Sequence, residues 1–169
     1  MSGADSHNLS SVDRLTVGTV GPPGRRTFLL QGRQGTLVVT LKMEKAQVAA
    51  LSAYLAKVLE DLPSPDHLPE DLDLEDADEP SWAVGTLGVT YDELTDRVLL
   101  VAEEAVTEEE EEEAAVARFG ATREQIAALV IRGAELVQAG RPPCPLCGYP
   151  LDPAGHACPR SNGHRPPAL

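Results

Sequence analysis

The chain has 169 residues, of which 42% are hydrophobic and only 4% are aromatic. This length predicts one main folded domain with a short appendage, because two full domains would be cramped. Fourteen Lys and Arg residues stand against 27 Asp and Glu residues, which gives a formal net charge of -13. Such a charge repels phosphate backbones and anionic membrane surfaces, and it argues against broad nucleic-acid or membrane binding.

The sequence also predicts a cytoplasmic location. It contains no apolar run near the length of about 18 residues that a membrane-spanning helix needs. Its N-terminus lacks the basic start and the apolar stretch of a secretory signal.

The first third of the chain predicts a flexible end followed by a strand meander. Residues 1–12 are polar and aperiodic, so we expect a flexible N-terminus. Short runs of β-type residues at 14–20, 27–31 and 36–41 are separated by turns rich in Gly and Pro. This pattern indicates three strands joined by turns.

A helix and an acidic linker are predicted next. Between residues 44 and 59, apolar side chains recur at spacings of three and four, which predicts an amphipathic helix that covers the sheet. Its apolar stripe consists of Val48, Leu51, Leu55 and Val58. Residues 60–80 are strongly acidic and contain no Lys or Arg, so we expect a solvated linker there.

The second half predicts a hairpin and a final helix. Residues 82–91 and 97–103 have the pattern of a strand pair, the second of them buried. Thr122 and Gln125 form a capping-box pattern, which marks the start of a helix. Gly140 is well placed to end that helix in a left-handed conformation.

Together these elements predict an α+β domain over residues 13–140. We expect an antiparallel sheet of about five strands covered by two helices. A small zinc-ribbon-like tail is expected over residues 141–169.

The tail carries the clearest chemical motif. Cys144 and Cys147 form a CxxC pair followed by glycine, a turn that points both sulfurs to one side. Cys158 and one histidine would complete a tetrahedral site for structural Zn²⁺. His156 is favoured as that ligand, because on an extended strand it shares a face with Cys158, two residues away. His164 is the alternative fourth ligand.

Two other interpretations of the cysteines are weaker. A redox CxxC usually opens a helix after a strand, whereas this one follows a helix and two prolines. A catalytic zinc would need an open coordination position, and this cluster can fill all four.

Three segments carry a resemblance to a known family. They are the strand Arg26-Thr27-Phe28-Leu29-Leu30-Gln31, the helix start at residues 44–48, and the stretch from Gly140 to Gly148. The chain resembles, over nearly its whole length, an actinobacterial family catalogued as domain of unknown function 3090. The resemblance implies no known activity. It also implies that His156 is the general zinc ligand, because the position of His164 is often tyrosine in that family.

The sequence favours a non-enzymatic role. The chain contains neither a Gly-rich phosphate-binding motif nor a GxSxG nucleophile motif. We therefore expect a zinc-binding interaction or regulatory protein with a protein partner whose identity the sequence does not give.

Two alternatives remain open. One is a metal-dependent enzyme that uses the carboxylates near the second hairpin, namely Asp92, Glu93, Asp96, Glu103 and Glu104. The other is a nucleic-acid-associated protein that uses the basic side chains of the tail, Arg141, Arg160 and Arg165.

Overall fold

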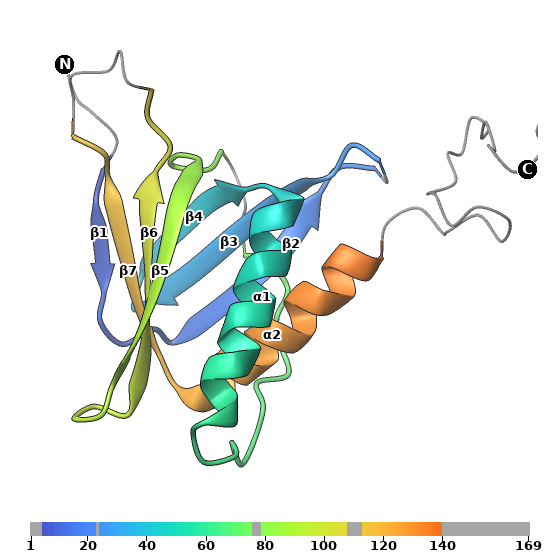
Figure 1. Cartoon of the computed structure of the whole chain (residues 1–169). Helices are drawn as coiled ribbons and strands as arrows, with labels where there is room; N and C mark the ends of the chain where they lie inside the picture. The colour runs from blue at the N-terminus through green and yellow to red at the C-terminus, as the bar shows by residue number, and fades with distance from the viewer. Residues whose placement is uncertain (1–4, 23, 76–78, 108–112, 140–169) are drawn as a thin grey trace, which may run out of the picture.

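The computed structural model of the protein describes residues 5–22, 24–75, 79–107 and 113–139. In chain order its elements are β1 (His7–Leu9), β2 (Arg14–Val20), β3 (Thr27–Gln34), β4 (Leu37–Met43), α1 (Lys45–Glu60), β5 (Val84–Asp92), β6 (Arg97–Glu104), β7 (Val116–Ala121) and α2 (Arg123–Gln138). The predicted α+β class with two helices is confirmed (Figure 1). Neither helix is long and apolar enough to cross a bilayer.

The strands form two sheets, so the prediction of one sheet of about five strands is wrong. Four strands lie in the order β1-β7-β6-β5, and three lie in the order β2-β3-β4. The predicted meander and the predicted hairpin are both present as antiparallel pairs. A parallel bridge between Lys42 and Ala83 joins the two sheets. Local strand patterns do not encode which strands pair, because pairing depends on contacts between distant segments.

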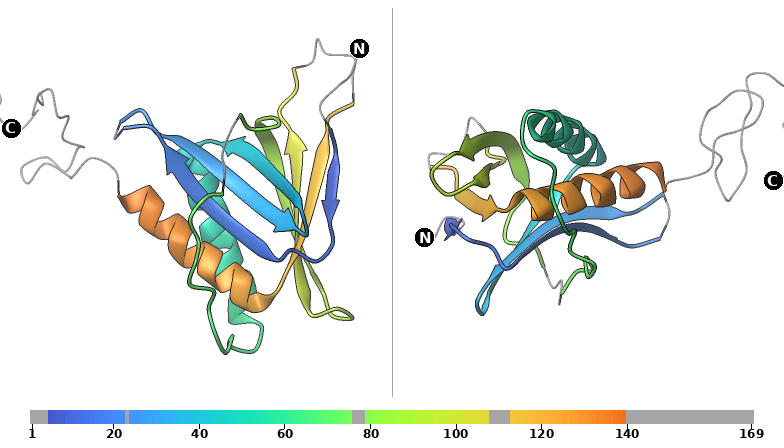
Figure 2. Two further views of the ribbon diagram at one scale, coloured as in Figure 1. Left: turned by 180° about the vertical axis from the view of Figure 1, so that it is seen from behind. Right: turned by 90° about the horizontal axis from the view of Figure 1, so that it is seen from below.

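The two helices pack against each other on one face of the three-stranded sheet (Figure 2). The predicted stripe of α1 faces the core: Val48, Leu51 and Leu55 are buried. The capping box at the start of α2 is also present. The Gln125 N–H donates to Thr122 Oγ1 at 3.1 Å, and the Thr122 N–H donates to Gln125 Oε1 at 2.9 Å. These reciprocal bonds satisfy backbone donors at the helix start.

Gly32 and Phe119 bring the two sheets together. Phe119 of β7 is fully buried in the core. A Cβ atom at Gly32 of β3 would lie only 2.6 Å from the Phe119 ring. A glycine is therefore needed at this position, because any larger residue would push the sheets apart.

Regular structure begins closer to the N-terminus than the sequence predicted. Residues 7–9, expected within a flexible end, form β1 and pair in parallel with β7. Leu9 is fully buried, and the Val12 N–H donates to the Gly120 carbonyl at 2.9 Å. A three-residue strand has no readable periodicity, and β7 is rich in Ala and Gly, so the sequence predicted neither strand.

Part of the predicted acidic linker also packs against the domain. Residues 71–75, here called the strap, cross the face of the three-stranded sheet that lies opposite the helices (Figure 2). Thr16 donates to the Leu72 carbonyl at 2.5 Å, and Leu74 lies against Gly18. Arg14 forms an ion pair with Asp71 at 3.2 Å. The prediction of a fully solvated linker is wrong here, because sheet residues far away in sequence supply the partners of these acidic residues.

Candidate functional site

The predicted zinc ligands lie outside the described residues. This applies to Cys144, Cys147, His156 and Cys158 and to the alternative His164. It applies equally to the three arginines of the nucleic-acid alternative. Within the described residues, no group of three or more His, Cys, Asp or Glu side chains is arranged to hold a metal ion.

The carboxylates of the second hairpin are not brought together. Asp92 accepts hydrogen bonds from the Leu94 N–H and the Thr95 hydroxyl, both at 3.0 Å, so it stabilises the turn. The strand register pairs Asp92 with Arg97 but Glu103 with Thr86. Thr86 and Asp92 are six positions apart on an extended strand, which is about 20 Å. The two ends of this acidic group therefore cannot share one metal ion or one substrate.

Asp96 belongs to a hydrogen-bonded network that joins the hairpin to α2. Its carboxylate accepts from the Tyr91 hydroxyl at 2.6 Å and from Arg123 Nε and Nη2 at 3.2 and 3.1 Å. Arg123 Nη1 also donates to the Pro63 carbonyl at 2.6 Å. The bond from Tyr91, followed by those from Arg123, lowers the pKa of Asp96. The same bond to Asp96, together with burial, raises the pKa of Tyr91. The network holds the hairpin in place, and it gives the Asp96 carboxylate a structural role.

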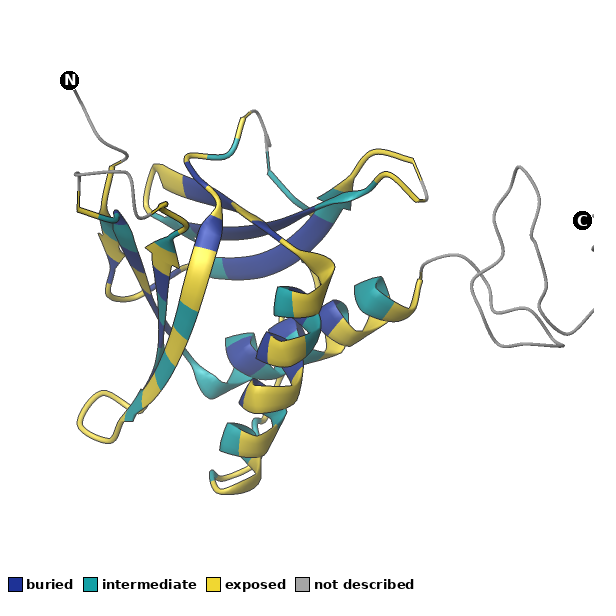
Figure 3. Ribbon diagram, turned by 45° about the horizontal axis from the view of Figure 1, so that its top comes forward, coloured by how far each residue is buried: buried dark blue, intermediate teal, exposed yellow. Residues whose placement is uncertain are grey.

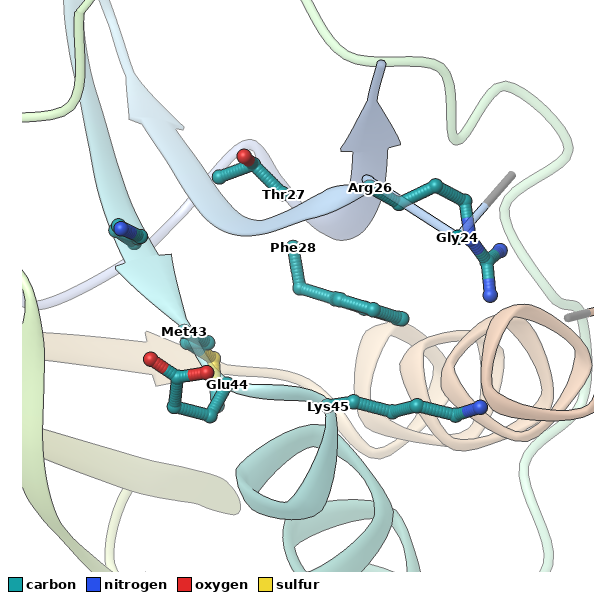
Figure 4. Close-up of a pocket in the computed structure, with 8 residues that line it drawn as sticks. Gly24, Arg26, Thr27, Phe28, Met43, Glu44 and Lys45 are labelled. Carbon is teal, nitrogen blue, oxygen red and sulfur yellow. The ribbon is translucent and has the colours of Figure 1, made fainter. Parts of the chain in front are cut away.

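A polar cavity of about 340 Å³ lies near the start of α1 and is lined by Arg26, Lys42 and Lys45. Figure 4 shows Arg26 and Lys45 extending toward α2, on either side of Phe28. Arg26 lies 5.1 Å from the centroid of the Phe28 ring and donates to the Leu136 carbonyl at 3.2 Å. The last turn of α2 has no basic residue of its own, so Arg26 supplies the cation that its negative end favours. These contacts account for the position of the Arg26 side chain, so no bound ligand is needed to explain it.

A second cavity, of about 560 Å³, is an apolar groove between α1 and β5, here called the α1–β5 groove. Ala50, Leu51 and Tyr54 line it from the helix, and Leu87, Gly88 and Val89 line it from the strand. At one end the side chain of Gln47 donates to the carbonyls of Val84 and Gly85, at 2.9 and 3.4 Å. These bonds fasten the helix to the start of the strand.

Several apolar side chains of the groove remain accessible to solvent. Tyr54 is 55% exposed. Leu87 and Val89 pack against the core but are only half-buried. Figure 3 shows exposed positions along β5 and along α1, and Ala50 and Tyr54 of the groove are among the exposed residues of α1. Tyr54 was the one residue from which the sequence could have indicated this groove, because it is an aromatic residue outside the predicted apolar stripe of its helix.

The free edge of β5 runs along this groove. β5 is the last strand of its sheet, so only β6 pairs with it in the described part of the chain. The outer edge of β4, by contrast, is partly covered, because its backbone bonds with Ser81 and Trp82 at 2.8 and 3.0 Å. β1 is only three residues long. β2, the other edge strand of the three-stranded sheet, has seven residues, and Arg132 of α2 donates to its Val17 carbonyl at 3.3 Å. With nine residues, β5 is the longest of the four edge strands in the described part of the chain.

Comparisons with known proteins identify a family but indicate no activity. No curated protein and no solved structure matches the chain. A family model described as "Protein of unknown function (DUF3090)" matches residues 7–158, which include every helix and strand of the described domain and the first part of the tail. The chain therefore belongs to the DUF3090 family of proteins of unknown function.

Proposed function

We propose that the protein is a non-enzymatic interaction module that binds a protein partner in the α1–β5 groove. The observation that carries this proposal is the open apolar groove beside a strand edge that has no partner strand among the residues the structure describes. Exposed apolar surface beside polar surroundings is typical of interaction sites, and aromatic side chains such as Tyr54 often supply much of the binding energy.

We further propose that the tail holds one structural Zn²⁺ through Cys144, Cys147, Cys158 and His156. The CxxC pair and the clustering of all three cysteines support this assignment. We propose a cytoplasmic location as well, where reducing conditions keep cysteines available for a metal. The family match includes all four of these residues and ends before His164. A rigid zinc tail would add a second surface for the partner.

The interaction proposal is tested with the full-length protein and two charge-matched variants. Ala50 and Ala53 are both exposed on α1, but Ala50 lines the α1–β5 groove whereas Ala53 lines the space between the two helices. Ala50→Arg should abolish recovery of a partner by affinity purification at native expression, and Ala53→Arg should not. Recovery of the same proteins, or of none, with all three forms would contradict the proposal.

The zinc assignment is tested by metal analysis of purified variants. His156→Ala should lower the zinc content below one ion per chain, whereas His164→Ala should leave it unchanged. The opposite result would make His164 the fourth ligand. Zinc content near zero in the unmodified protein would remove the site altogether.

A further inference from the structure

The outer edge of β5, which pairs with no strand of the described residues, lacks the usual protection of an edge strand. Natural edge strands are commonly guarded by Lys, by Pro or by extreme shortness, because free backbone groups attract other chains. β5 has nine residues, VGTLGVTYD, with no Lys, Arg or Pro. Its bulge lies at the start, between Val84 and Thr86, where α1 is already fastened to the strand. Most of the strand is thus regular and open.

Packing accounts for only one of the two glycines of β5. A Cβ atom at Gly85 would lie 2.8 Å from the Ala105 backbone, so packing requires that glycine. A Cβ atom at Gly88 would meet nothing within 4 Å, so packing does not require this one. An unexplained glycine within a strand often marks a place where another backbone approaches closely.

The charges around the groove favour a basic occupant. No charged residue of the described part of the chain lines the α1–β5 groove itself, so the relevant charges are those around it. Asp92 and Glu93 lie at the hairpin end of β5, with Arg97 opposite Asp92, and Glu103 and Glu104 lie beside the start of β5 on β6. Lys57 is the only cation in the last turn of α1, which is followed by Asp61. The chain as a whole carries -13, so a second copy would be repelled whereas a cationic segment would be attracted.

We infer that the α1–β5 groove binds an extended, positively charged segment of a partner protein, which pairs with β5 as an additional strand. This inference rests on the proposed interaction function. The backbone of the segment would bond to the free edge of β5, and every second side chain would enter the groove between Leu87, Val89 and Tyr54. An occupant of this kind would have apolar residues at alternate positions and basic residues near its ends.

Selection from a random peptide library displayed on phage tests the inference. The full-length protein, Ala50→Arg and Ala53→Arg serve as three separate baits, after urea unfolding has verified that they are equally stable. Peptides enriched on the unmodified protein should alternate apolar and polar residues and carry net positive charge. They should bind Ala53→Arg and fail to bind Ala50→Arg.

Backbone pairing is then examined with one enriched peptide, synthesised with single N-methyl groups at successive residues. N-methylation should weaken binding about tenfold at alternate positions, since one lost backbone hydrogen bond is worth about 1 to 1.5 kcal/mol. Methylation at the positions between should have little effect. Affinity should also fall between about 50 mM and about 500 mM NaCl, because salt screens the attraction.

The other outcomes separate the inference from the function on which it rests. Enriched peptides that have helical periodicity or net negative charge, but still fail on Ala50→Arg, would overturn the inference and leave the groove as an interaction site. The same holds if the unmodified protein sediments as a dimer and Ala50→Arg as a monomer, because a second copy would then occupy the edge. Failure to enrich any peptide, or equal binding to all three baits, would contradict both.

Discussion

Replacement of Gln31 by leucine should detach the strap from the sheet. Gln31 is a polar residue of β3 that is only 2% exposed. Its side-chain amide donates to the Thr40 hydroxyl and to the Glu75 carbonyl, both at 3.0 Å, and its side-chain oxygen accepts from the Glu75 N–H at 2.7 Å. The Gln31 side chain therefore both donates to and accepts from the backbone of the strap, much as a neighbouring strand would.

The expected loss of stability is calculated from these three hydrogen bonds. At about 1 kcal/mol each they contribute about 3 kcal/mol, and the greater burial of apolar surface by leucine offsets about 1 kcal/mol. We therefore expect Gln31→Leu to lower the free energy of unfolding by about 2 kcal/mol. The ion pair between Arg33 and Glu75, at 3.1 Å, adds little because both side chains are about one-third exposed.

Urea unfolding and amide hydrogen exchange measure the two consequences. The urea midpoint should fall, and the amide of Glu75 should exchange faster while amides of the β5–β6 hairpin remain protected. Gln34→Leu, also in β3, is the control, because Gln34 accepts one exposed hydrogen bond from Ser11 and should cost less than about 1 kcal/mol. An unchanged midpoint together with unchanged exchange at Glu75 would refute this account of the strap.

The remaining predictions concern the hairpin network, the sheet contact and the groove. Because hydrogen bonds lower the pKa of Asp96, its stabilising effect should be complete above the ordinary carboxyl pKa and should disappear as the pH falls through the folded-state value. Asp96→Asn should therefore reduce the urea midpoint at neutral pH, with the difference from the unmodified protein shrinking below about pH 4; a constant difference would contradict this. Gly32→Ala should lower the free energy of unfolding by about 1 to 3 kcal/mol, because its methyl group would press on Phe119. Gly88→Ala should change it by less than about 1 kcal/mol, and equal losses for the two would refute the packing argument. Ala50→Arg should leave the free energy of unfolding, measured by urea denaturation, within about 0.5 kcal/mol of the original, since the position is exposed on a helix.

The acidic composition has two different structural roles in the described domain. Carboxylates of the strap form ion pairs with Arg14, Arg33 and Arg132, so part of the acidic segment is held on the surface of the sheet. Around the β5–β6 hairpin, Asp92 and Asp96 shape a turn and its contact with α2. Neither group has the converging geometry of a metal-dependent active site, which is why the interaction proposal is favoured over the enzymatic alternative.

The sequence by itself determined the local elements of this protein. β-branched runs between Gly- and Pro-rich turns predict β2, β3 and β4, and the spacing of Val48, Leu51 and Leu55 predicts α1, because backbone geometry alone decides which residues share a face. The capping box predicts the start of α2 to the residue, since the two side chains bond only to neighbouring backbone groups.

Only the tertiary structure decided the rest. β1 and β7 exist as strands because each buries the other's apolar side chains, as Leu9 and Phe119 do, and no local pattern reports that partnership. The division into two sheets and the docking of the strap depend in the same way on residues distant in sequence. So does the α1–β5 groove: Tyr54 and Leu87 are 33 positions apart in the chain, and their common surface arises only when packing places an edge strand beside a helix.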